Sequence, residues 1–147
     1  MSQVKTVAAT HKAVQAAGKS GRHGHTPHEL IKKIEAGLSF RELDKLRERL
    51  GLSIEELGDK LGISRATLHR RKVSGRLTPA ESDRVLRFVH LVDFAERVLG
   101  GAEQARQWLS YPQYGLGRVV PLEFARTEVG AREVETLLGR IEYSVYA

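Results

Sequence analysis

The chain of 147 residues contains no cysteine, which excludes disulfide bonds and thiolate metal sites and suits a reducing compartment. No apolar run approaches the roughly 18 residues that a membrane-spanning helix needs. The N-terminus has no apolar core followed by a cleavage site, so it does not resemble a secretion signal. No segment alternates apolar and polar residues as a half-buried strand does. These absences predict a cytoplasmic, all-α protein with no membrane contact.

The sequence also has few features of an enzyme. It contains no nucleophile elbow, no histidine and carboxylate cluster at helical spacing, and no metal signature. Gly115 and Gly117 are interpreted as turn glycines, because no strand precedes them and no Lys-Ser or Lys-Thr pair follows. His23, His25 and His28 lie in a loose segment that fixes no coordination geometry. We therefore expect a binding protein without a metal or cofactor.

Positive charge is unevenly spread along the chain. The formal net charge is +6, and residues 1–28 carry four basic groups and no acidic one, whereas residues 100–147 carry a net charge of −1. Residues 60–80 hold six basic side chains and no acidic one. A compact positive patch of this kind suits a polyanion, and a solvated basic face is the alternative interpretation.

Helix boundaries are marked clearly in the sequence. A Ser or Thr N-cap followed three residues later by Glu predicts a capping box, and a Gly just after an apolar run predicts a helix end. The predicted N-caps are Thr26, Ser39, Ser53 and Thr78, and the predicted closing glycines are Gly51 and Gly100. Thr127 is predicted to cap the last helix.

Residues 53–72 read SIEELGDKLGISRATLHRRK and predict two short helices joined by a tight turn. Gly62 permits the positive backbone angle that the turn requires, and Ser64 caps the second helix. Gly58 leaves space where the helices cross, and Leu68 points inward. The pattern resembles an Xre-like helix-turn-helix of the Cro and repressor type, which implies DNA binding in the major groove.

At about 100° per residue, the side of the second helix away from Leu68 carries Ala66, His69, Arg70 and Val73. His69 and Arg70 are the candidates for base edges, because Arg can bridge two guanine acceptors. Arg65, Lys72 and Arg76 are expected to bind phosphate, as is the N-terminus of the second helix, and small residues on this face can touch a thymine methyl. The full predicted DNA-binding set is Ser64, Arg65, Ala66, Thr67, His69, Arg70, Lys72 and Arg76. Arg71 stands where such motifs usually bury an apolar residue, so we expect its stem to pack and its head to reach a phosphate.

Residues 79–99 predict one long helix with apolar residues on more than one side. A lone surface helix needs a single apolar stripe. The helix is therefore expected to pack against the helix-turn-helix on one side and against the C-terminal domain, or a second copy of the chain, on the other. A homodimer would also suit a repeated DNA half-site.

The C-terminal third carries a second resemblance. It rests on Val98-Leu99-Gly100, Glu103, Ala105, Trp108-Leu109, Leu116-Gly117, Pro121, Thr127, Gly130, Val134, Leu137 and Arg140-Ile141-Glu142. This pattern resembles the toxin-binding domain of the Xre/MbcA/ParS antitoxin family. The resemblance implies a RES-type, NAD-consuming toxin as the partner, and repression of the shared operon by the antitoxin.

The last five residues form an apolar, aromatic peptide, which is unusual for a chain terminus. We expect it to enter or cover the toxin's NAD pocket, with tyrosines as anchors. The alternative is that Tyr143 and Tyr146 complete the chain's own core, whereas Trp108 and Leu109 are expected to be core. The predicted toxin-binding set is Tyr143, Ser144, Val145, Tyr146, Ala147, Arg140 and Glu142.

The predicted organisation is a flexible basic arm at 1–25, a helix-turn-helix domain at 26–90 and a toxin-binding domain at 91–147. The expected partners are the toxin, operator DNA and a second copy of the chain. The rival interpretation is a stand-alone Xre-like transcription regulator whose C-terminal domain serves dimerisation or sensing. The helix-turn-helix by itself is compatible with both interpretations.

Overall fold

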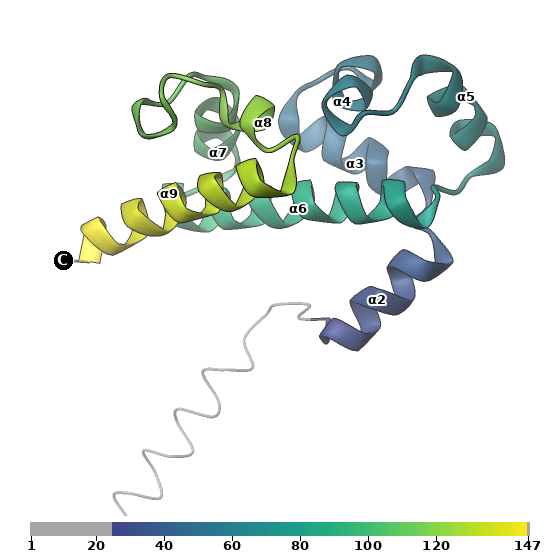
Figure 1. Cartoon of the computed structure of the whole chain (residues 1–147), viewed down its shortest axis with the longest axis horizontal. Coiled ribbons are helices and arrows are strands. Elements are labelled where there is room, and N and C mark those ends of the chain that lie inside the picture. Colours follow the sequence, from purple (N-terminus) through teal and green to yellow (C-terminus); the bar gives the residue numbers. More distant parts are fainter. Residues whose placement is uncertain (1–24, 147) are drawn as a thin grey trace, which may run out of the picture. The chain divides into compact units, whose positions relative to one another are not determined.

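The computed structural model of the protein describes residues 25–146, with side chains for 25–144. The predicted N-terminal arm therefore lies almost entirely outside the described residues. The helices are α2 (Pro27–Ala36), α3 (Phe40–Leu50), α4 (Ile54–Leu61), α5 (Arg65–Ser74), α6 (Pro79–Leu99), α7 (Ala102–Ser110), η1 (Tyr114–Leu116), α8 (Pro121–Phe124) and α9 (Glu128–Tyr146) (Figure 1). Residues 32–147 form one compact unit, and α2 begins in the other, residues 1–31.

The all-α class is confirmed. The described residues contain no strand, only two isolated β-bridges, between Ser39 and Arg76 and between Gln113 and Val119. Within the described part, no helix is long and apolar enough to cross a membrane.

Three of the four predicted capping boxes are present. At Ser53 and Thr78 the hydroxyl accepts a hydrogen bond from the third helical N–H, while the glutamate at that position accepts one from the cap's own N–H. Thr26 and Glu29 form the same pair of bonds at the start of α2. Each such box satisfies two backbone donors that a helix end would leave unpaired.

The capping box predicted at Ser39 is absent, and this prediction was wrong. Ser39 is the N-cap of α3, but its side chain makes no capping bond. The N–H of Glu42, which the box would pair with the Ser39 hydroxyl, donates instead to the Ser39 carbonyl oxygen at 3.0 Å. A distant segment pairs with the residues on either side of the cap: Phe40 N–H donates to Gly75 O at 2.9 Å, and Leu77 N–H donates to Leu38 O at 2.8 Å. The start of α3 is thus held by the segment that follows α5.

Helix α6 is the central element of the 32–147 unit. Figure 1 shows α3 and α4 along one part of α6 and α7 and α9 along the other. Val85, Phe88, Leu91 and Val92 are all at most 2% exposed, because neighbours cover α6 on more than one side. The predicted two-sided packing is confirmed, with the chain's own C-terminal helices on the second side.

The C-terminal helices close around a small apolar centre of their own that is continuous with α6. Leu109, Leu122, Val134 and Leu138 are each at most 1% exposed. The predicted core role of Leu109 is confirmed, and Trp108 is half-buried against the same core. Residues 32–147 form a single unit, so the fold does not mark a boundary between residues 90 and 91. The predicted domain boundaries therefore remain predictions.

Candidate functional site

Helices α4 and α5 form the helix-turn-helix that the sequence predicts. Gly62 ends α4 with φ +70°, and its N–H donates back to Asp59 O. Ser64 caps α5 by accepting from Thr67 N–H at 3.2 Å. A Cβ on Gly58 would lie 2.5 Å from Leu68 Cδ1, so only a very small residue permits this approach of the two helices.

The face of α5 predicted to enter the major groove is free of packing. Leu68 is 5% exposed, whereas Ala66, His69, Arg70 and Val73 are exposed. Arg70 is oriented by a hydrogen bond from Nη2 to Thr67 Oγ1 at 3.0 Å. The inward and outward sides of α5 are therefore as predicted, and the α5 surface is open to a ligand.

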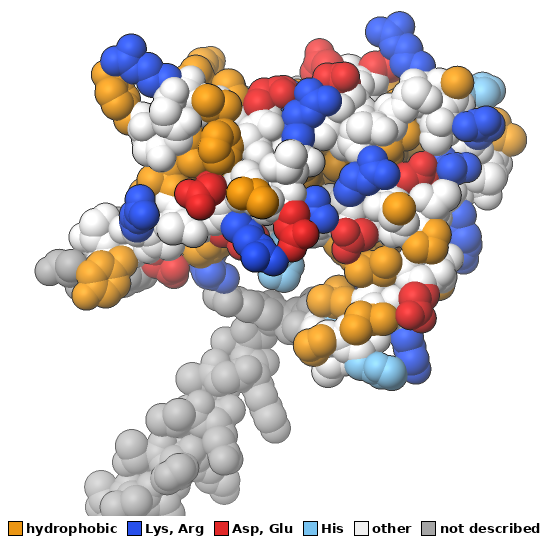
Figure 2. Space-filling view, in the orientation of Figure 1, with side chains coloured by type: hydrophobic (Ala, Val, Ile, Leu, Met, Phe, Trp, Pro, Cys, Tyr) orange, Lys and Arg blue, Asp and Glu red, His pale blue; other side chains and the backbone are white. Residues whose placement is uncertain are grey.

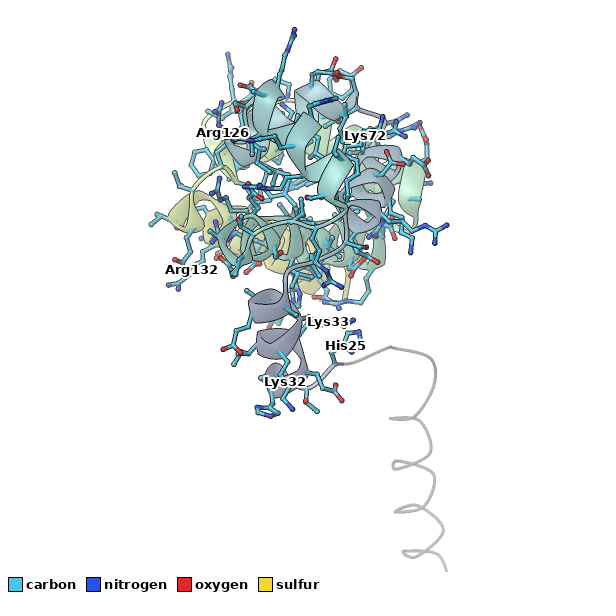
Figure 3. The ribbon with its side chains drawn as sticks, turned by 90° about the vertical axis from the view of Figure 1, so that its right-hand side faces the viewer. His25, Lys32, Lys33, Lys72, Arg126 and Arg132 are labelled. Atoms are coloured by element: carbon cyan, nitrogen blue, oxygen red, sulfur yellow. The ribbon has the colours of Figure 1, made fainter. Side chains whose placement is uncertain are left out.

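Basic side chains flank this face. Arg65 and Lys72 are exposed and take part in no ion pair within the described residues. Lys72 extends from α5 at the end of the unit that faces the viewer in Figure 3. Figure 2 shows Lys and Arg side chains gathered over this end. A polyanion would meet several uncompensated cations here.

Arg71 does not occupy the position expected for it. Its Nε donates to Glu81 Oε1 at 2.7 Å, and the Glu81 side chain is 8% exposed. Burial alone would raise the pKa of Glu81, but hydrogen bonds from Arg71 and from the Thr78 backbone outweigh it and leave the pKa lowered. Arg71 is therefore directed at α6 rather than outward toward phosphate, because the buried carboxylate needs a cationic partner.

Arg76 is exposed, but it also braces the backbone. Its Nη1 donates to Gly37 O at 3.0 Å, next to the β-bridge that joins Ser39 and Arg76. The same Nη1 also donates to Ala36 O at 3.4 Å. Its predicted phosphate contact stays a prediction.

A depression of about 670 Å³ lies between α3, α4 and α5, beside the exposed face of α5. Phe40, Ile54 and Leu68 contribute its apolar lining, and Arg41 joins Arg65 and Lys72 among its charged lining residues. The sequence prediction missed Arg41. No local spacing connects a residue in the first turn of α3 with α5, because only packing between helices brings them together.

The other flank of α5 is acidic. Glu55, Glu56 and Asp59 are exposed on α4 and line a shallow depression together with Ser64 and Arg65. Carboxylates repel phosphate at short range. The depression between α3, α4 and α5 also contains two carboxylates, Asp44 and Glu55, but its four cations outnumber them. Negative charge is therefore favoured on the α3 side of α5 over the α4 side.

The predicted toxin-binding tail continues α9, which extends to Tyr146. Tyr143 is 79% exposed, so the interpretation that it completes the chain's own core is wrong. Arg140 and Ser144 are exposed, and the Ser144 hydroxyl donates to Ile141 O at 3.0 Å. The side chains of Val145 and Tyr146, and all of Ala147, lie outside the described residues.

Glu142 differs from its neighbours in the predicted set. It is half-buried, and its Oε1 lies 3.8 Å from Arg97 Nε on α6. Arg97 also stacks over the Phe94 ring at 4.8 Å. Glu142 therefore helps to hold α9 on α6, while Arg140 and Tyr143 face outward.

Two family models match successive parts of the chain. Residues 29–90 match the antitoxin Xre-like helix-turn-helix domain, and residues 94–143 match the antitoxin Xre/MbcA/ParS C-terminal toxin-binding domain. The helix-turn-helix falls within the first range, and α7, α8 and all but the last three residues of α9 fall within the second. Together they define an antitoxin that carries a helix-turn-helix ahead of a toxin-binding domain.

Relatives of known name agree with this class. Antitoxin Xre of Yersinia enterocolitica is 38% identical over 120 residues, covering 80% of this chain and 81% of the relative. Antitoxin Xre of Photorhabdus laumondii is 33% identical over 114 residues, covering 76% and 77%. Antitoxin Xre of Pseudomonas putida is 34% identical over 113 residues, covering 77% and 70%. The chain belongs to the Xre antitoxin family.

A solved structure shares the fold. A chain in the crystal structure of the M. tuberculosis MbcT-MbcA toxin-antitoxin complex matches 74% of this chain and 96% of its own length. The TM-score is 0.55 and the sequence identity is 24%. At this identity the similarity supports the fold alone.

Proposed function

We propose that this chain binds and neutralises a RES-type, NAD-consuming toxin, and that it represses its own operon as a DNA-bound homodimer in the cytoplasm. One observation carries the proposal: a single compact unit presents an exposed basic α5 and, on another helix, an exposed tail tyrosine. DNA and a protein partner can therefore use different surfaces of the same molecule.

The DNA-binding part rests on the surface of α5. Arg70 and His69 project from the side opposite the buried Leu68, where a helix in the major groove reads base edges. Ser64 caps α5 through the Thr67 N–H, and the other backbone N–H groups of the first turn would meet a phosphate there, as those of helix N-termini do. Arg65, Lys72 and the remaining members of the predicted set would add backbone contacts.

A binding experiment with operator and random duplexes tests this part. Arg70→Ala is expected to weaken binding to the preferred site by roughly 1–3 kcal/mol, because it removes a base contact, and to change random-duplex binding less. Binding of the parent chain should fall steeply as salt rises, because counterions are released. Arg132→Ala is the matched control, since Arg132 is an exposed arginine on α9. Equal losses for both variants would contradict the groove assignment.

The toxin-binding part rests on the outer side of the end of α9. Tyr143 exposes a large ring beside the exposed Arg140, and such residues make effective interface anchors. The solved complex of similar fold contains a toxin together with its antitoxin. The identity of the toxin as RES-type, and the blockage of its NAD pocket by the tail, belong to the proposal.

Deletion of residues 143–147 tests the tail. Cells that express the RES-type toxin of the same operon should lose protection when this truncated chain replaces the parent. Operator binding should be retained, because α5 and its core are untouched. Protection that survives the deletion rules out the pocket plug, and loss of DNA binding as well would indicate a misfolded chain.

The non-enzymatic role has its own measurement. The purified chain alone is expected to leave NAD unchanged over hours, whereas the toxin consumes it and the complex does not. Turnover of NAD by the chain without toxin would contradict the proposal.

Light scattering of the purified chain tests the homodimer.

A further inference from the structure

The loop between α7 and α8, residues 111–120, has an ordered and unusual construction. Gln113 N–H donates to Val119 O at 3.1 Å, and Arg118 N–H donates to Gln113 O at 2.9 Å, which closes the loop as a narrow hairpin. The Gln113 side chain donates in turn to Trp108 O at 2.9 Å. The hairpin is therefore tied to the end of α7 and held in one shape.

The inner side of the hairpin is packed tightly on α9. Leu116 is buried, and a Cβ on Gly115 would lie 2.6 Å from Leu137 Cδ1. The hairpin thus has little freedom to move toward or along α9. Whatever its outer side presents is held in place before any partner arrives, which lowers the entropy lost on binding.

The outer side presents aromatic rings to solvent. Tyr114 is 82% exposed and Tyr111 is 65% exposed, and Val119 adds further apolar surface. Arg118 lies with its guanidinium carbon 4.8 Å from the centre of the Tyr114 ring, and its Nη2 donates to the Tyr114 hydroxyl at 2.8 Å. Figure 2 shows hydrophobic and basic side chains together on this loop. We refer to Tyr111, Tyr114, Arg118 and Val119 as the hairpin patch.

Arg118 adopts a backbone conformation that favours glycine. Its φ is +66°, and among the described residues no other non-glycine has a positive φ. Glycine would take this conformation without the steric penalty of a Cβ. Arginine in this conformation lowers the stability of the folded state, and strained residues of this kind concentrate at functional sites.

The positive charge of Arg118 in the hairpin patch is not matched by acidic residues in the surrounding sequence. No acidic residue occurs between Glu103 and Glu123. Arg118 takes part in no ion pair within the described residues, and its side chain lies against Tyr114. A surface that complements the patch would bring apolar area for the rings and a carboxylate for the guanidinium.

We infer that the hairpin patch is a second docking surface for the toxin, separate from the tail, and that it contacts a carboxylate surrounded by apolar surface. This inference rests on the proposed function. The hairpin and the C-terminal end of α9 lie at the end of the 32–147 unit away from α5 (Figure 1). One partner could therefore engage both while DNA occupies α5.

Toxin affinity measured by calorimetry, with the RES-type toxin of the same operon, tests the inference. Arg118→Gly is expected to lower affinity at least 10-fold while leaving the unfolding midpoint unchanged or higher, because glycine removes both the cation and the strained conformation. Arg118→Glu should lower affinity further by charge repulsion, and Tyr114→Ala should lower it about as much as Arg118→Gly. Arg132→Ala is the control for loss of an exposed arginine in the same domain, and it should bind as the parent does.

The outcomes separate this inference from the proposed function. If the parent chain captures toxin and Arg118→Gly and Tyr114→Ala bind equally well, the hairpin patch is not a docking surface, and the proposed function stands. If the parent chain captures no toxin, both are overturned. Variants that lose operator binding or dimerisation while keeping toxin affinity also overturn the inference, because the patch would then serve DNA or a second copy of the chain.

Discussion

At the scale of single residues, two glycines of α9 occupy opposite environments. A Cβ on Gly130 would lie 1.6 Å from the carbonyl oxygen of Phe124, whereas one on Gly139 would meet nothing within 4 Å. Gly130 also donates its N–H to the capping hydroxyl of Thr127 at 3.0 Å. The close turn between α8 and α9 therefore depends on a hydrogen atom in place of a side chain at position 130.

Alanine at each of these positions should have opposite effects on stability. Gly130→Ala is expected to lower the free energy of unfolding by about 2 kcal/mol or more, because a backbone carbonyl cannot yield as a side chain can. Gly139→Ala should raise it by roughly 0.5–1 kcal/mol through helix propensity alone. Urea unfolding of both variants checks this, and a Gly130→Ala chain as stable as the parent would contradict the described corner.

At the scale of elements, α5 and α6 are joined by a charged contact instead of the apolar one that such motifs usually have. Arg71 reaches Glu81, which is also the third residue of the α6 capping box and accepts from Thr78 N–H at 2.9 Å. One carboxylate therefore both starts α6 and orients α5. Its pKa is lowered despite burial, so the bonds favour the charged form.

This contact should make stability depend on pH in the acidic range. Because the folded-state pKa of Glu81 lies below the ordinary value of 4.5, its contribution is present above pH 4.5 and is lost as pH falls through the lowered pKa. Glu81→Gln keeps the capping geometry but removes the charge. Denaturation at several pH values should show the variant less stable than the parent at neutral pH, with the gap closing in acid. A gap that stays constant would show that Glu81 stabilises by shape alone.

At the scale of the whole described chain, α6 joins the two domains that match family models, and their buried side chains form one apolar core. Contacts between charged groups add to the apolar packing: Arg49 on α3 binds Asp93 on α6, and Lys60 on α4 binds Glu123 on α8. Hydrogen bonding to Lys60 lowers the pKa of Glu123. The orientation of α5 relative to the C-terminal helices is thus set within the 32–147 unit.

One cooperative unfolding transition should result. The chain has a single tryptophan, Trp108, and it lies on α7. Leu57→Ala, in the buried face of α4, should lower the free energy of unfolding by about 2–5 kcal/mol. Trp108 fluorescence should report this loss to the same extent as far-UV circular dichroism, although α4 and α7 belong to different matched domains. A fluorescence midpoint that does not move would indicate two independent cores.

Local features of the chain were predictable from sequence because their physics is local. The capping boxes at Ser53 and Thr78 join residues that are three positions apart. Gly62 ends α4 through its own positive φ, and the position of Leu68 on the inward side of α5 follows from helical periodicity. Periodicity likewise placed the exposed face of α5 and the two-sided burial of α6. The resemblance in residues 98–142 then indicated the antitoxin class, which the relatives confirm.

Contacts between distant segments needed the tertiary structure. Ser39 lacks its predicted box and the segment after α5 holds the start of α3, Arg71 turns from the expected phosphate to Glu81, and Arg41 lines the depression beside α5. In each case the partner lies outside the residue's own helix, and no spacing rule encodes the contact. The 79% exposure of Tyr143 was decided in the same way, because only the packing of α9 on its neighbours determines which side of that helix remains open.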